Sequence, residues 1–205
     1  MLGNWNVNVI TDAMPQKVAS AVGKLAETLI GAEYTPIAYL GSQPVNGTNH
    51  AVLAEQVVTT GRDTKNIVVL IFNEKPGAME ATLVNIERVV ESGMPLGGIN
   101  INVHTDIPEE AMAEWNSAFE GFVGSSVTPK ILLGTQVVKG VDYIFLAEVK
   151  PVVANPVNRV AIVTVNSLTK NVTFSDLLEN RHEASLQYAF TWLKNGLSAP
   201  LGEWP

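Results

Sequence analysis

The chain has 205 residues, of which 13 are Lys or Arg and 20 are Asp or Glu, giving a formal net charge of −7. This balance, without any cluster of basic residues, argues against nucleic acid and anionic membranes as partners. The absence of cysteine excludes disulfides, thiolate metal sites and a cysteine nucleophile.

Three further expectations follow from the gross features of the chain. Its apolar runs are too short to span a membrane, and its length suits one or two domains. No secretory signal opens the sequence, and a cysteine-free chain suits a reducing compartment. We therefore expect a cytoplasmic protein, with a secreted form that has lost its signal as the alternative.

The first half of the sequence predicts a leading strand, one helix and several strands. Residues 1–10 alternate like a strand, and apolar positions at helical spacing then predict a helix over residues 15–30, which Thr11 or Asp12 can cap. The pattern at residues 81–91 fits either a last strand or a short helix. Between the predicted helix and the segment at residues 81–91, we expect strands at residues 34–42, 49–60 and 66–72.

The second half repeats this plan. Residues 99–103 predict a strand, and Asp106 can cap the helix that follows. The remaining elements are a hairpin at residues 128–149, strands at residues 160–166 and 172–178, and an extra helix at residues 182–195.

The resemblance between the halves extends to individual residues. Residues 35–47, TPIAYLGSQPVNG, align with residues 128–140, TPKILLGTQVVKG, which lie 93 positions downstream (35 to 128). Residues 2–12 align with residues 96–106 at a distance of 94 positions (2 to 96). The chain is therefore a tandem duplication.

The duplication predicts two domains, residues 1–93 and residues 94–205, and the second carries the extra helix and a tail. Each copy is long enough to bury its own core. One helix packed on one face of an antiparallel sheet belongs to the α+β class. The sequence at residues 200–205, PLGEWP, resembles the start of each copy, so the chain is either part of a longer array or ends in a coincidental match.

The break in the second hairpin, residues 136–140, reads QVVKG. The β-branched and aromatic runs on its two sides predict antiparallel strands joined by a tight turn. Val137 and Val138 are apolar residues on a tip that is usually polar. Either they fold back onto the sheet, or they form a surface that a partner covers.

The order of these features resembles the cystatin family, the inhibitors of papain-like cysteine proteases. The family pattern combines an N-terminal Gly, a helix, a Q-x-V-x-G hairpin and a second hairpin with Pro or Trp. The second copy has Gly97 and Gly98 before its helix and residues 136–140 after it. The first copy has Gly3 and residues 43–47 in the same order. This arrangement is similar to the disulfide-free stefins and the plant cystatins.

The resemblance implies two tandem cystatin-like domains, each an antiparallel sheet of five strands wrapped around one long helix. It also implies a wedge, made of the N-terminal lead and two hairpin tips, that enters the protease cleft. Both copies depart from the pattern, because Pro44 stiffens the first loop and Thr169 stands where stefins have Pro. The implied protease-binding residues are Gly3, Gln43, Pro44, Val45, Asn46, Gly47, Pro76, Gly97, Gly98, Gln136, Val137, Val138, Lys139, Gly140 and Leu168.

The expected function is therefore reversible inhibition of a papain-like cysteine protease, with the second copy binding more tightly. The alternative is a cystatin-fold module that inhibits nothing and serves in structure or protein binding. Family hairpins are known to swap between chains, so the resemblance also allows a domain-swapped homodimer.

The sequence offers no pattern for catalysis or for cofactor binding. The three histidines, His50, His104 and His182, are far apart, and no Gly-rich phosphate-binding motif follows a predicted strand. We therefore expect no enzyme activity, no catalytic residues, no metal ion and no cofactor.

Overall fold

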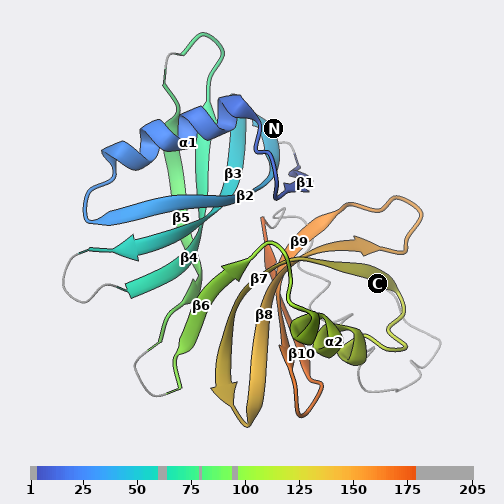
Figure 1. The fold of residues 1–205 in the computed structure, drawn as a ribbon. Helices are drawn as coiled ribbons and strands as arrows, with labels where there is room; N and C mark the ends of the chain where they lie inside the picture. Colours follow the sequence, from blue (N-terminus) through green and yellow to red (C-terminus); the bar gives the residue numbers. More distant parts are fainter. Residues whose placement is uncertain (1–3, 60–63, 79, 94–96, 179–205) are drawn as a thin grey trace, which may run out of the picture.

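The computed structural model of the chain describes residues 4–59, 64–78, 80–93 and 97–178. Within these residues the chain forms two antiparallel sheets of five strands each and two short helices (Figure 1). The predicted helix at residues 182–195 and the repeat-like tail at residues 200–205 lie outside the described residues.

The first sheet is a meander in which each strand pairs with the next one in the chain, in the order β1-β2-β3-β4-β5. The segment at residues 81–91, which the sequence left between strand and helix, contains strand β5. The elements of this half are β1 (Asn6–Ile10), α1 (Gln16–Thr28), β2 (Ala32–Val45), β3 (Gly47–Val58), β4 (Thr64–Glu74) and β5 (Thr82–Glu91).

The second sheet repeats the same order with the corresponding strands, β6-β7-β8-β9-β10. Its helix again follows the first strand, as the duplication predicts. The elements are β6 (Ile99–His104), α2 (Glu109–Ala118), β7 (Ser125–Val138), β8 (Gly140–Pro151), β9 (Arg159–Asn166) and β10 (Val172–Leu177).

The central strands of both sheets are buried on both faces. In β3, Ala51 and Leu53 point to one side and Val52 and Ala54 to the other, and all four are fully buried. Successive side chains of a strand point to opposite faces, so a sheet covered on both sides needs continuous apolar runs. This explains why the central strands read as uninterrupted apolar segments.

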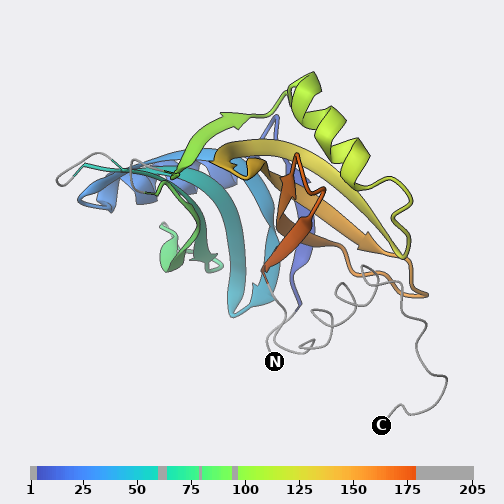
Figure 2. The same cartoon turned by 90° about the horizontal axis from the view of Figure 1, so that it is seen from below.

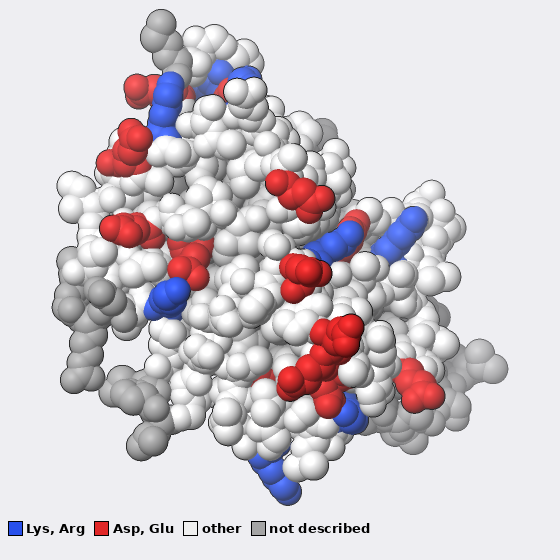
Figure 3. Space-filling model, in the orientation of Figure 1, with Lys and Arg blue, Asp and Glu red and all other residues white. Residues whose placement is uncertain are grey.

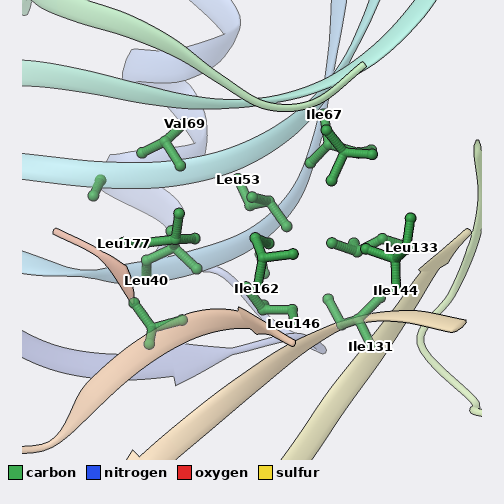
Figure 4. Packing of buried hydrophobic residues seen from close by; sticks show 14 of the residues in the cluster. Leu40, Leu53, Ile67, Val69, Ile131, Leu133, Ile144, Leu146, Ile162 and Leu177 are labelled. Carbon is green, nitrogen blue, oxygen red and sulfur yellow. The ribbon is translucent and has the colours of Figure 1, made fainter. Parts of the chain in front are cut away.

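The inner faces of the two sheets meet in one shared hydrophobic cluster (Figure 4). Equivalent residues of the two copies contribute to it, such as Leu40 with Leu133 and Leu53 with Leu146, each pair 93 positions apart. The contacts between the halves are reciprocal as well, because β1 lies near β9 and β6 near β4. The two copies therefore face each other like the subunits of a symmetric dimer joined into one chain.

Each helix covers the outer face of its own sheet, so the order of layers is helix, sheet, sheet, helix. Val18 and Val22 of α1 pack on the outer residues of β2, β3 and β4. Trp115 of α2 lies with its ring centre 4.9 Å from that of Phe145 in β8. Figures 1 and 2 show the two helices far apart, each beside its own sheet.

The predicted fold class is wrong. The molecule is mostly β, with two facing sheets of five strands, and it is not a pair of tandem cystatin-like domains with a sheet wrapped around a long helix. The helices are short, with 13 and 10 residues. The reason lies in the inner faces, which are as apolar as the outer ones and bury each other. The boundary between residues 93 and 94 stays a prediction.

The predicted helix caps are also wrong. The N-cap positions are Pro15 and Pro108, and neither helix has a side-chain hydrogen bond at its cap. Thr11 instead donates a hydrogen bond to the carboxylate of Asp12 at 2.6 Å. Both helices begin three or more residues after the predicted caps, which places those side chains outside the first turn.

Candidate binding edge

The tip of the β7–β8 hairpin is tighter than the sequence predicts. The strands pair up to Val138 and Gly140, so that only Lys139 lies between them. Gly140 has a φ of 91°, a backbone conformation that glycine adopts without strain. Val137 is 73% exposed and Val138 is 44% exposed. The alternative that these valines fold back onto the sheet is therefore wrong.

The turn between β9 and β10 lies directly against this tip. The Val141 amide donates to the Ser167 hydroxyl at 2.9 Å, and the Ser167 amide donates to the Val141 carbonyl at 2.8 Å. A Cβ atom built on Gly140 would lie only 2.8 Å from Cβ of Leu168. Leu168 itself is 60% exposed. Three exposed aliphatic side chains thus come from two adjoining hairpins.

The N-terminal lead of the second copy joins the same edge. The side-chain amide of Gln136 donates to the Gly97 carbonyl at 2.6 Å. Gly97 is exposed and Gly98 is half-buried. The structure therefore brings together the three segments of the second copy that the resemblance places on a protease. We call residues 97–98, 136–140 and 167–169 the docking edge.

Asn166 forms a polar hub behind the docking edge. The residue is 9% exposed, and its side-chain nitrogen donates to Asp142 at 2.6 Å and to the Lys139 carbonyl at 3.3 Å. Its oxygen accepts from the Leu168 and Thr169 amides at 3.1 and 2.8 Å. Asn166 is absent from the predicted site residues. Its signal in the sequence is the segment Asn-Ser-Leu-Thr, since Asn commonly bonds the backbone two residues on in turns.

Helix α2 contacts the β9–β10 turn at Lys170. The ammonium group of Lys170 forms an ion pair with the carboxylate of Glu114, and Lys170 adopts a φ of 54°. The turn is thus held by the sheet through Asn166 and by the helix through Lys170. The backbone of Leu168 lies between these two attachments, which fix its position relative to the sheet.

The equivalent edge of the first copy is less apolar. Pro44 and Asn46 are exposed and Val45 is half-buried, while Pro76 lies exposed in the β4–β5 turn. Gly47 lies close to this turn, since a Cβ atom there would be 2.4 Å from the Glu74 carbonyl oxygen. Gln43 accepts a hydrogen bond from Asn49 at 3.0 Å. Gly3 lies outside the described residues.

A cluster of four polar side chains joins α1 to the first sheet. The hydroxyl of Tyr39 lies 3.2 Å from Nδ1 of His50, and Nε2 of His50 lies 3.5 Å from the Glu74 carboxylate. Lys17 of α1 pairs with Glu74 at 2.6 Å. Burial lowers the pKa of His50, although Glu74 acts to raise it. The hydrogen bond from Lys17 lowers the pKa of Glu74.

The second copy has Tyr143 at the position of His50, 93 residues downstream. Its hydroxyl donates to Glu110 of α2 at 2.5 Å, and this bond raises the pKa of Tyr143 to about 12. Both polar clusters therefore attach a helix to its sheet. Each cluster joins groups of the helix to groups of the sheet, which suits a structural role.

The chain carries few charged residues, and the acidic ones outnumber the basic ones, 20 against 13. Figure 3 shows acidic and basic side chains scattered over a mostly uncharged face, without a continuous basic patch among its described residues. In the part of the chain that the structure describes, no group of three His, Asp or Glu side chains could hold a metal ion.

Among the described residues, none of the helices has the length and hydropathy needed to cross a bilayer.

Neither a scan against protein-family models nor a search of curated proteins finds a match to this chain. A functional proposal therefore rests on the docking edge.

Proposed function

We propose that the protein binds a partner protein by inserting the docking edge into an apolar cleft, and that this partner is a papain-like cysteine protease, which it inhibits reversibly. The observation that carries the proposal is the exposure of Val137, Val138 and Leu168 on two adjoining hairpin tips. Exposed aliphatic residues that cluster on a stable turn favour a binding surface.

The energetics support binding by this edge. Burying a Val or Leu side chain contributes roughly 1.5–3 kcal/mol, so three of them supply several kcal/mol on docking. The hydrogen bonds of Ser167 and Gln136 already fix the tips in the free protein. A preformed surface loses little conformational entropy when it binds, which favours high affinity.

The second candidate is a protein-binding module that inhibits no protease. The corrected fold favours it, because the protease expectation came from a resemblance that implied one sheet around a long helix. The docking edge would then enter a cleft of another kind. Neither candidate assigns a chemical reaction to this chain.

The test is a titration of papain and a cathepsin with the parent protein and with three variants. The double variant Val137→Asp with Val138→Asp places charge at the contact and should abolish inhibition. Val45→Asp changes the edge of the first copy. Val152→Asp is the matched control, because Val152 is 74% exposed in the β8–β9 loop, outside the docking edge.

We expect inhibition by the parent, by Val152→Asp and by Val45→Asp, and none by the double variant. Inhibition constants above about 100 µM for both enzymes, or roughly −5.5 kcal/mol, would reject protease inhibition in favour of the second candidate. Loss of inhibition in Val45→Asp alone would move the site to the first copy.

A further inference from the structure

We propose that Asn166 is a positioning residue that couples the two hairpins of the docking edge, so that Val138 and Leu168, which lie on the same face, act as one contact surface, with Val137 on the opposite face of the tip. This inference rests on the proposed function of that edge. It assigns binding to the second copy because the first copy lacks the complete network.

The bonds of Asn166 connect both hairpins through a single side chain. Its nitrogen reaches Asp142 and the Lys139 carbonyl on the β7–β8 hairpin. Its oxygen holds the amides of Leu168 and Thr169 and the Thr169 hydroxyl, the last at 3.0 Å. A change at Asn166 therefore alters the position of Leu168 relative to Val138.

The first copy provides a natural comparison at Asn73, 93 positions before Asn166. Asn73 donates to Asn49 at 2.8 Å, as Asn166 donates to Asp142. Its side-chain oxygen, however, is buried and has no hydrogen-bond partner. Asn73 therefore lacks the bonds that would fix the next turn, and that turn is longer: eight positions separate β4 from β5 (Glu74 to Thr82), against six between β9 and β10 (Asn166 to Val172).

Burial makes the Asn166 network sensitive to donor and acceptor matching. A buried polar group left without its partner costs more than the bond itself contributes, and networks respond as units. Replacing Asn166 by Asp keeps the acceptor oxygens for the turn but removes the donor. It also places a second carboxylate beside Asp142. The side-chain link from Asn166 to the β7–β8 hairpin should break while the turn keeps its own bonds, so that only the two Ser167–Val141 hydrogen bonds still hold the turn against the tip.

The variants for the test are Asn166→Asp, the double variant Asn166→Asp with Asp142→Asn, and Asn73→Asp as the matched control. The double variant exchanges donor and acceptor, which restores the bond between the two positions at unchanged net charge. Two readouts are needed on the full chain. The first is the nuclear Overhauser effect between Leu168 and Gly140, and the second is the dissociation rate from papain.

We expect Asn166→Asp to weaken the Leu168–Gly140 signal and to dissociate at least tenfold faster. The double variant should recover both, and Asn73→Asp should change neither. An undiminished signal in Asn166→Asp, or no recovery in the double variant, would overturn the inference. If the parent does not bind papain, the proposed protease inhibition fails, and the Leu168–Gly140 signal still decides whether Asn166 couples the hairpins.

Discussion

The two copies hold their helices in different ways. In the second copy, Trp115 and Phe119 stack with ring centres 4.3 Å apart, and Phe119 packs edge-on against Phe174 of β10. The first copy has Val22 and Ala26 at the positions of the two stacked residues. A groove of about 810 Å³ lies between α1 and the β4–β5 turn, with Leu25 and Ala81 among its lining residues.

The inner faces keep two leucine pairs but differ at other positions, since Ala38 and Ala51 of the first copy correspond to Ile131 and Ile144 of the second. Leu40, Leu53 and their equivalents keep both identity and burial, since Leu133 and Leu146 are also buried. Each inner face is a surface of contact with the other copy, so a change on one side must fit the other. The outer faces and the hairpin edges have no such constraint. This comparison teaches that the shared core kept its two buried leucine pairs, while the residues that hold the helices and form the hairpin edges differ between the copies.

The largest expected effect tests the difference in helix packing. Trp115→Ala should lower the free energy of unfolding by about 3–5 kcal/mol, because it removes a buried aromatic ring. Val22→Ala should cost about 1.5 kcal/mol plus a small cavity term. Urea unfolding of both variants checks this, with the exposed Val84→Ala as control. Equal losses for Trp115 and Val22 would contradict the comparison.

The next prediction tests the shared core. Leu53→Ala and Leu146→Ala should each cost about 2–5 kcal/mol, since both side chains are fully buried in the same cluster. Both variants should weaken amide protection in both sheets, as measured by hydrogen exchange. If each variant affected only its own copy, the halves would behave as the independent domains that the sequence predicts at residues 1–93 and 94–205.

A smaller effect distinguishes the two hairpin tips. Gly47→Ala and Gly140→Ala each place a side chain at positive φ, which costs on the order of 1–3 kcal/mol. At Gly47 the new Cβ also meets a backbone oxygen at 2.4 Å, whereas at Gly140 its nearest neighbour is Cβ of Leu168, at the longer distance of 2.8 Å. Gly47→Ala should therefore be the more destabilising variant in thermal unfolding. The reverse order would show that the β9–β10 turn is the more rigid one.

The smallest effect concerns the polar clusters and pH. Because burial lowers the pKa of His50, the His50 imidazole binds a proton at higher pH in the unfolded chain than in the folded chain. The free energy of unfolding should therefore fall as the pH drops through about 6.5 and below, until folded His50 is also protonated.

His50→Tyr takes the residue of the second copy and should remove this part of the pH dependence. Glu74 does not affect this measurement. Its pKa is lowered from 4.5, so the stability that its carboxylate contributes is lost only at pH values around and below 4.5. The free energy of unfolding, measured at several pH values between about 7.5 and 5.5, gives its slope against pH. An unchanged slope in His50→Tyr would exclude His50 as its source.

The sequence predicted much of the candidate site but not how it is held together. The QVVKG motif indicated the hairpin, and the resemblance grouped it with Gly97 and Leu168. The hub at Asn166 was missed, because its partners lie on another hairpin, as far as 27 residues away. Such a partner is fixed by the register of β8 against β9, which local patterns do not specify.

Local patterns determined the strands, the two helices and the duplication, because alternation, helical spacing and repeated segments are properties of the chain itself. They did not determine what covers the second face of each sheet. An apolar strand run fits a sheet covered by a helix or by another sheet, and Ala51 and Val52 read alike in the sequence. Only the tertiary structure decided that the inner faces bury each other. Burial of apolar area depends on which surfaces meet in space, and this choice made the molecule a two-sheet fold.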